Sequence, residues 1–138
     1  MMELKRWRDR LGIPIALEPK CFPSDETAAT RLLIAATQQG RDGVRLAEEI
    51  GRALWERDEN IADPAVLIAA VGRAGLDADA VCAAAAPEAD LDAVWAANTA
   101  EAIARGVFGA PSYVLADGEI FWGQDRLDLL EWRLSGRA

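Results

Sequence analysis

Residues 112–122, SYVLADGEIFW, constrain the fold of this chain more than any other stretch. Two short runs of strand-forming residues flank Asp117-Gly118, a dipeptide typical of the two-residue type I′ turn of a β-hairpin. Both faces of such a hairpin are largely apolar, so we expect it to lie in a larger sheet that helices cover on both sides. The turn predicts three cross-strand pairs: Tyr113 with Trp122, Val114 with Phe121, and Leu115 with Ile120. We expect the aromatic residues of these pairs to lie in the core.

Most of the chain before this hairpin has helical patterns. Three prolines predict that residues 13–23 are extended, and Gly12 is a typical helix end. We predict helices at residues 3–11 and 24–39, from Asp63 to near Gly75, and from Asp77 to Pro87. Another helix is marked by the spacing of Val44, Ala47, Ile50 and Leu54. A longer helix is predicted before Gly106, with Leu91, Trp95, Asn98 and Ala102 on one stripe.

Side chains with oxygen acceptors stand where several of these helices begin. We predict N-caps at Ser24, at Asp63 before Pro64, and at Asp77, because their oxygens accept hydrogen bonds from the free N–H groups of the first turn. Asp125 is predicted to cap a last helix in the same way, with Leu127, Leu130 and Leu134 facing inward. Since Asn98 lies on an apolar stripe, we expect a buried amide there and not a site residue.

Length and charge limit the class of protein. The chain has 138 residues, 51% of them hydrophobic, which suits a single domain, 1–138. Its 15 basic and 23 acidic residues give a net charge of −8, and this balance argues against nucleic acid as a partner. No window offers the ~20 uncharged residues of a membrane span. We therefore expect a soluble, cytoplasmic protein.

The chain contains no histidine. This excludes Ser-His-Asp and Cys-His nucleophile pairs and zinc sites of the HExxH type. Cys21 and Cys82 lie too far apart in sequence for a CxxC redox pair or a zinc knuckle, so we interpret both as reduced structural thiols and expect no metal.

The hairpin is entered through Gly109-Ala110-Pro111, in the stretch GVFGAPSYV. By itself such a proline indicates only a turn, and most X-Pro bonds are trans. Together with the hairpin and a closing helix, the corner resembles the second half of a thioredoxin fold, in which this proline is cis. The longer stretch NTAEAIARGVFGAPSYVLADGEIFWGQDRLDLLEWRL resembles the end of 2-hydroxychromene-2-carboxylate isomerases, relatives of kappa-class glutathione transferases in the DsbA-like group. The likeness extends through IADPAVLIAAVGRAGLD, PKCFPSDETAATRLLIAA and RWRDRLGIPI.

The resemblance implies an α/β thioredoxin-like (DsbA-like) fold that is incomplete. Residues 1–106 are then a mainly helical subdomain, and 107–138 are the C-terminal ββα part. The implied activity is a glutathione-dependent cis/trans isomerisation of an aromatic pyruvate-type intermediate, with glutathione as cofactor and a small aromatic molecule as substrate. In that reaction the glutathione sulfur adds to the conjugated system, a bond rotates, and the sulfur leaves.

Four residues form the implied glutathione site. The backbone of Ala110 pairs with the cysteinyl part of glutathione and Pro111 holds the corner, while Gln124 and Asp125 receive the γ-glutamyl end. For Asp125 the residues alone favour a plain helix cap, and only the resemblance adds the ligand role.

The chain departs from the family pattern at its start. Family members begin with a strand-helix-strand unit that carries the serine thought to stabilise the glutathione thiolate, so we expect no catalytic residue in this chain and little turnover from it alone. The hairpin edge at residues 112–116 is expected to be open, which favours a homodimer. The alternatives are a glutathione transferase or DsbA-like oxidoreductase of the same fold, and a non-catalytic binding or dimerisation module.

Overall fold

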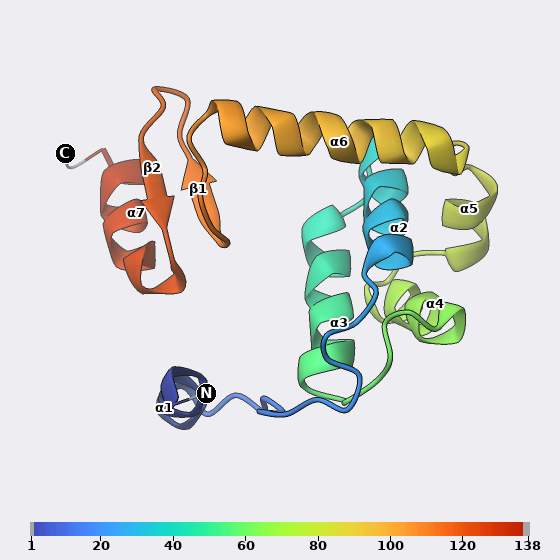
Figure 1. Cartoon of the computed structure of the whole chain (residues 1–138), viewed down its shortest axis with the longest axis horizontal. Coiled ribbons are helices and arrows are strands. Elements are labelled where there is room, and N and C mark those ends of the chain that lie inside the picture. Colours follow the sequence, from blue (N-terminus) through green and yellow to red (C-terminus); the bar gives the residue numbers. More distant parts are fainter. Residues whose placement is uncertain (1, 137–138) are drawn as a thin grey trace. The chain divides into compact units, whose positions relative to one another are not determined.

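The computed structural model describes residues 2–136 and divides into two compact units, Met1–Trp95 and Ala96–Ala138 (Figure 1). The division falls within the long helix α6, and each unit has its own elements. The first contains α1 (Met2–Leu11), α2 (Thr27–Gln38), α3 (Gly43–Trp55), α4 (Pro64–Arg73), α5 (Ala78–Ala83) and the start of α6 (Glu88–Ala104). The second contains the end of α6, β1 (Ser112–Val114), β2 (Ile120–Trp122), the 3₁₀ turn η1 (Gln124–Arg126) and α7 (Leu127–Leu134).

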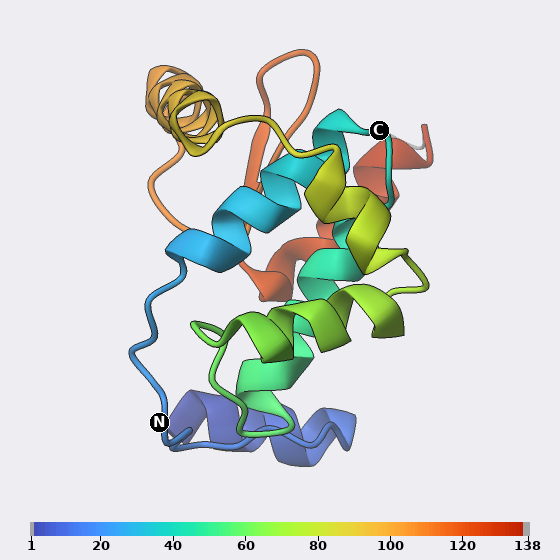
Figure 2. The same ribbon diagram turned by 90° about the vertical axis from the view of Figure 1, so that its right-hand side faces the viewer.

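The core of the first unit lies between α2, α3, α4 and α5, which can be followed in Figure 2. Its largest fully buried side chains are Leu46, Val71 and Val81. Several alanines of α2, α3 and α4 are also completely buried, and such small side chains allow helices to approach closely. The predicted stripe on α3 is half wrong, because Val44 and Ala47 are exposed whereas Ile50 and Leu54 are buried.

Two of the predicted N-caps of this unit are confirmed. The carboxylate of Asp63 accepts a hydrogen bond from the backbone N–H of Ala65, and that of Asp77 accepts one from Ala80. The helix after Asp77 is shorter than predicted and ends at Ala83.

The predicted cap at Ser24 is wrong. The Ser24 hydroxyl donates to the carbonyl of Cys21, and α2 begins only at Thr27. The Asp25 carboxylate accepts from the Thr27 N–H at 2.9 Å instead. Ser24 therefore closes the preceding turn, which contains a cis peptide bond between Phe22 and Pro23.

The hairpin of the second unit forms with a register one residue away from the predicted one. The observed pairs are Ser112 with Trp122, Tyr113 with Phe121, and Val114 with Ile120. The reason is the loop: the Leu115 N–H donates to Glu119 O at 2.9 Å and the Gly118 N–H donates to Leu115 O at 3.0 Å, which leaves three loop residues in place of two. Gly118 has a φ of 90°, as expected where a type I turn is followed by a left-handed residue.

The predictions of burial in this unit are also wrong. Among the described residues, none in β1, β2, η1 or α7 is buried, and the sheet has two strands. Tyr113 and Trp122 are exposed, as are Leu127 and Leu134, while Leu130 and Phe121 are half-buried. A two-stranded hairpin and an eight-residue helix provide too little surface to bury both apolar faces. No helix within residues 2–136 is long and apolar enough to span a membrane.

Candidate functional site

The corner before β1 is built by close packing around two glycines. Gly106, with a φ of 82°, ends the run of α6, and the chain turns through Gly109. A Cβ atom on Gly109 would lie 2.5 Å from the indole Nε1 of Trp122, so only glycine fits beneath that ring. Phe108 packs against the same ring with the two ring centroids 5.1 Å apart. Trp122 thus supports the corner from the second strand.

The peptide bond between Ala110 and Pro111 is cis. Two hydrogen bonds fix the residues on either side of it: the Ser112 hydroxyl donates to Gly109 O at 2.5 Å, and the Gly123 N–H donates to Pro111 O at 2.9 Å. The second bond brings η1 beside the corner. The structure therefore places Ala110, Pro111, Gln124 and Asp125, all of them exposed, on two neighbouring segments of the same unit.

The backbone of Ala110 is free to bind a ligand. Its N–H and carbonyl take part in none of the hydrogen bonds formed among residues 2–136. A free donor and acceptor on one residue can pair with a peptide-like molecule as a neighbouring strand would.

Asp125 does not cap a helix, contrary to the prediction. Neither η1 nor α7 has a side-chain cap, and the Asp125 carboxylate lies close to Gly123 and pairs with Arg126, with Oδ2 and Nη1 3.0 Å apart. A Cβ atom on Gly123 would meet Asp125 Oδ1 at 2.5 Å. The carboxylate is about half exposed and is open to a further cationic partner.

A cavity of about 390 Å³ adjoins the corner within the second unit. Its walls come from α6, from the corner and from β1, and include Asn98, Glu101, Arg105, Ala110 and Val114. Glu101 and Arg105 form an ion pair with an Nη2–Oε1 distance of 2.7 Å. Asn98 is exposed, so the prediction of a buried amide at this position is wrong. The spacing of Asn98, Glu101 and Arg105 on one helical face just before the corner was the signal for this wall.

The family model for the DSBA-like thioredoxin domain matches residues 1–135. The chain belongs to this family. It is also 34% identical over 133 residues to 2-hydroxychromene-2-carboxylate isomerase from Sphingobium xenophagum, and these residues are 95% of this chain and 64% of the relative. A solved structure of selenomethionine 2-hydroxychromene-2-carboxylate isomerase superposes with a TM-score of 0.70 at 24% identity, covering 97% of this chain and 63% of the other. The chain thus spans just under two thirds of the length of both relatives.

The site of this DSBA-like thioredoxin domain offers binding groups: a free backbone donor and acceptor, an amide, a carboxylate, and a partly apolar cavity. Its hydroxyl, Ser112, is already a donor to Gly109 O. Within residues 2–136 no group of three or more cysteine, aspartate or glutamate side chains is arranged to hold a metal ion.

Proposed function

We propose that this chain binds glutathione at the Ala110–Pro111 corner and takes part in a 2-hydroxychromene-2-carboxylate isomerase reaction. The observation that carries the proposal is the unpaired backbone of exposed Ala110, beside an exposed carboxylate on η1. The 34% identity to the Sphingobium isomerase supports the choice of reaction.

Each glutathione group has a matching partner in the proposed complex. The cysteinyl backbone pairs with Ala110, and Pro111 keeps that residue in place. The γ-glutamyl ammonium pairs with Asp125, while the side-chain amide of Gln124 donates to the α-carboxylate of the same γ-glutamyl residue. The aromatic part of the substrate enters the cavity lined by Val107 and Val114, close to the cysteinyl sulfur.

The proposed chemistry is an isomerisation with no net gain or loss of atoms. The glutathione thiolate forms a C–S bond to the conjugated substrate, which turns the adjacent double bond into a single bond that rotates. The C–S bond then breaks and returns the thiolate. The role of this chain is to position the sulfur, and positioning alone contributes strongly to rate.

A kappa-class glutathione transferase or DsbA-like oxidoreductase is the second candidate. Transferases of this fold would use the same glutathione contacts, so binding does not separate the two. Cys21 and Cys82 are both free thiols, which suits the reducing cytoplasm that we propose for the protein.

Calorimetric titration with glutathione tests the binding proposal. Replacing Asp125 with Asn should weaken binding about tenfold, because a charge-assisted hydrogen bond contributes roughly 1.5–3 kcal/mol. Asp128→Asn, which removes the same charge from the first turn of α7, should leave the affinity unchanged. Glutathione acetylated on the γ-glutamyl nitrogen should bind weakly to the wild type and no worse to Asp125→Asn. Equal binding of both glutathione forms would contradict the role of Asp125.

We further propose that β1 pairs with β1 of a second copy, giving a homodimer. The bonds of Leu115 to Glu119 and of Gly123 to Pro111 direct alternate backbone groups toward β2, so those of Ser112 and Val114 point away from it. Around a two-fold axis at Tyr113, Ser112 of one copy would face Val114 of the other, and the free donors and acceptors match.

Sedimentation should show a dimer at micromolar concentration, and Val114→Pro, which removes an outward N–H, should give a folded monomer. A wild-type monomer contradicts this pairing.

A further inference from the structure

A second cavity, of about 470 Å³, lies in the first unit, and none of its lining residues belongs to the proposed glutathione site. It is formed by α1, by the turn at residues 13–15 and by the second half of α3. Its lining is mostly apolar: Leu4, Ile13, Pro14, Ile15, Gly51 and Trp55 form the walls, and Glu48, Arg52 and Glu56 form the rim. This volume lies in the range of pockets that bind small molecules.

The walls of this cavity are held in place by specific contacts. The Ala16 N–H donates to the carbonyl of Trp55 at 2.6 Å, which ties the turn to the end of α3. Phe22 packs against Trp55 with ring centroids 4.8 Å apart, and so supports the indole. These contacts connect both the backbone and the indole of Trp55 to the segment before α2.

Gly51 keeps the floor of the cavity open. It lies in the interior of α3, where glycine is less favourable than alanine by roughly 0.5–1 kcal/mol. A Cβ atom at this position would meet no other atom within 4 Å. A side chain here would project into the cavity, so the residue offers a direct way to fill it.

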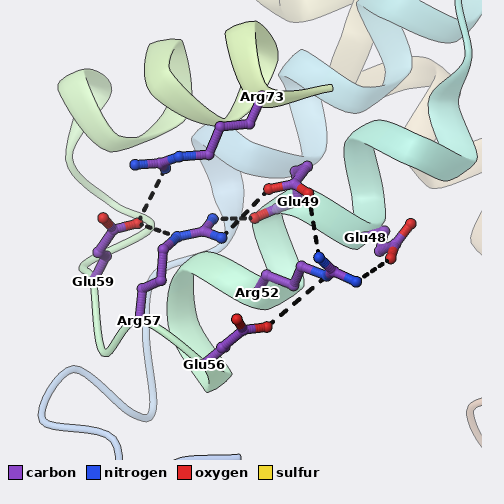
Figure 3. A network of polar contacts seen from close by, with 7 residues as sticks. All are labelled: Glu48, Glu49, Arg52, Glu56, Arg57, Glu59 and Arg73. Carbon is purple, nitrogen blue, oxygen red and sulfur yellow. Dashed lines mark hydrogen bonds and ion pairs between the residues drawn. The ribbon is translucent and has the colours of Figure 1, made fainter. Parts of the chain in front are cut away.

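The charges of the rim do not balance. Arg52 is shared by three carboxylates, with nitrogen–oxygen distances of 2.8 Å to Glu48 and 3.9 Å to both Glu49 and Glu56 (Figure 3). Glu49 also pairs with Arg57 at 3.4 Å, which leaves Glu48 and Glu56 with one guanidinium between them. The lining residues thus carry one uncompensated negative charge beside a tryptophan.

We propose that this cavity binds a small aromatic cation. The rings lie among Ile13, Ile15 and Trp55, and the cationic group lies at the rim against the Glu56 carboxylate, which is 3.9 Å from its nearest Arg52 nitrogen and so is only loosely paired. A cation close to an indole gains a cation–π attraction in addition to its attraction to the carboxylates, and burial of the rings supplies the rest. The inference is independent of the proposed glutathione site.

Titration with 1-naphthylmethylammonium, followed by calorimetry and by the Trp55 indole resonance, tests this site. We expect saturable 1:1 binding that is at least about tenfold tighter than that of 1-naphthoate, which has the same rings and the opposite charge. Gly51→Leu should abolish binding. Gly72→Leu is the matched control, because Gly72 also lies within a helix, α4, has no atom within 4 Å of a Cβ, and does not line the cavity.

Four results would overturn the proposal. Equal affinity for the cation and 1-naphthoate would remove the role of the rim, and so would unchanged affinity in the folded double variant Glu48→Gln, Glu56→Gln. Binding that survives in folded Gly51→Leu would place the ligand elsewhere. Loss of ligand binding as the protein concentration rises would show that a second copy occupies the groove. Circular dichroism establishes that each variant is folded.

Discussion

Arg31 on α2 donates two parallel hydrogen bonds to the carboxylate of Asp92 on α6, from Nε to Oδ1 and from Nη2 to Oδ2, both 2.7 Å long. A third bond, 2.5 Å long, runs from Nη1 to Glu88 Oε2. These contacts join residues that are 61 and 57 positions apart in the chain. They therefore fasten the start of α6 to the helical core of the first unit, beside the small apolar cluster of Ile34, Ala35 and Leu91.

The first prediction concerns this pair and pH. The hydrogen bond and charge of Arg31 hold the pKa of Asp92 below its ordinary value of 3.8. A lowered pKa in the folded state stabilises the protein above the unfolded-state pKa, and this contribution disappears as the pH falls through the folded-state pKa. Asp92→Asn should therefore lower Tm at pH 7, and its difference from wild type should shrink below about pH 4.

Asp90→Asn provides the control for that measurement. Asp90 lies on the first turn of the same helix, and among residues 2–136 its carboxylate forms no ion pair. Thermal melts at several pH values should show little difference between this variant and wild type. An Asp92→Asn defect of equal size at pH 7 and pH 3 would show that the effect is steric and not due to the ion pair.

The second prediction concerns the face of α3 that forms the core. Leu46 is completely buried, so Leu46→Ala should lower the free energy of unfolding by about 2–5 kcal/mol. Val44, two residues earlier, is 84% exposed, and Val44→Ala should change it by less than about 0.5 kcal/mol. Urea denaturation of both variants measures the difference. A larger effect at Val44 would mean that the predicted stripe through Val44 and Ala47 faces the core after all.

Sequence reasoning was most successful where the cause of a structure is local. Asp63 and Asp77 cap helices as predicted, because the cap depends only on the next few residues. Gly12, Gly75 and Gly106 have positive φ angles after helices, as their positions indicate. The cap predicted at Ser24 is wrong because two neighbouring side chains, Ser24 and Asp25, could each accept from the first turn of α2. The turn at Cys21 decides between them, since the Ser24 hydroxyl donates to the Cys21 carbonyl.

The hairpin shows a limit of a different kind. Asp117-Gly118 fits a two-residue and a three-residue loop, and one residue of difference reverses which side chains share a face. The prediction of the glutathione-site residues depended on the family resemblance, because no pattern in WGQDR distinguishes a ligand-binding Asp125 from one that caps a helix. The Asn98 wall was missed because an apolar stripe on a helix was assumed to be buried, whereas nothing within the described second unit covers that part of α6.

The third prediction concerns this loop. Gly118 has a φ of 90°, so Gly118→Ala should cost about 1–2 kcal/mol although no atom lies within 4 Å of the added Cβ. Gly72→Ala adds the same methyl group inside α4 and should instead stabilise the protein by about 0.5–1 kcal/mol. Hydrogen exchange of the Leu115 N–H, which bonds to Glu119 O, reports the hairpin directly. Unchanged exchange in Gly118→Ala would contradict the three-residue loop.

The fourth prediction concerns isomerase activity. The proposed contacts bind glutathione but do not favour its thiolate: Ala110 acts through its backbone, Pro111 has no N–H, and the negative charge of Asp125 disfavours a nearby anion. The 138-residue chain should therefore show little turnover of 2-hydroxychromene-2-carboxylate with glutathione, measured by absorbance. Adding the part of the Sphingobium relative that lies outside the matched residues should raise the rate at least a hundredfold, because one oriented donor to an anion contributes ~3 kcal/mol. The added part alone and its mixture with the Asp125→Asn chain are the controls. Full activity of the chain without it would show that a residue among these 138 stabilises the thiolate, and Ser112, whose hydroxyl already lies at the corner, would be the first to replace.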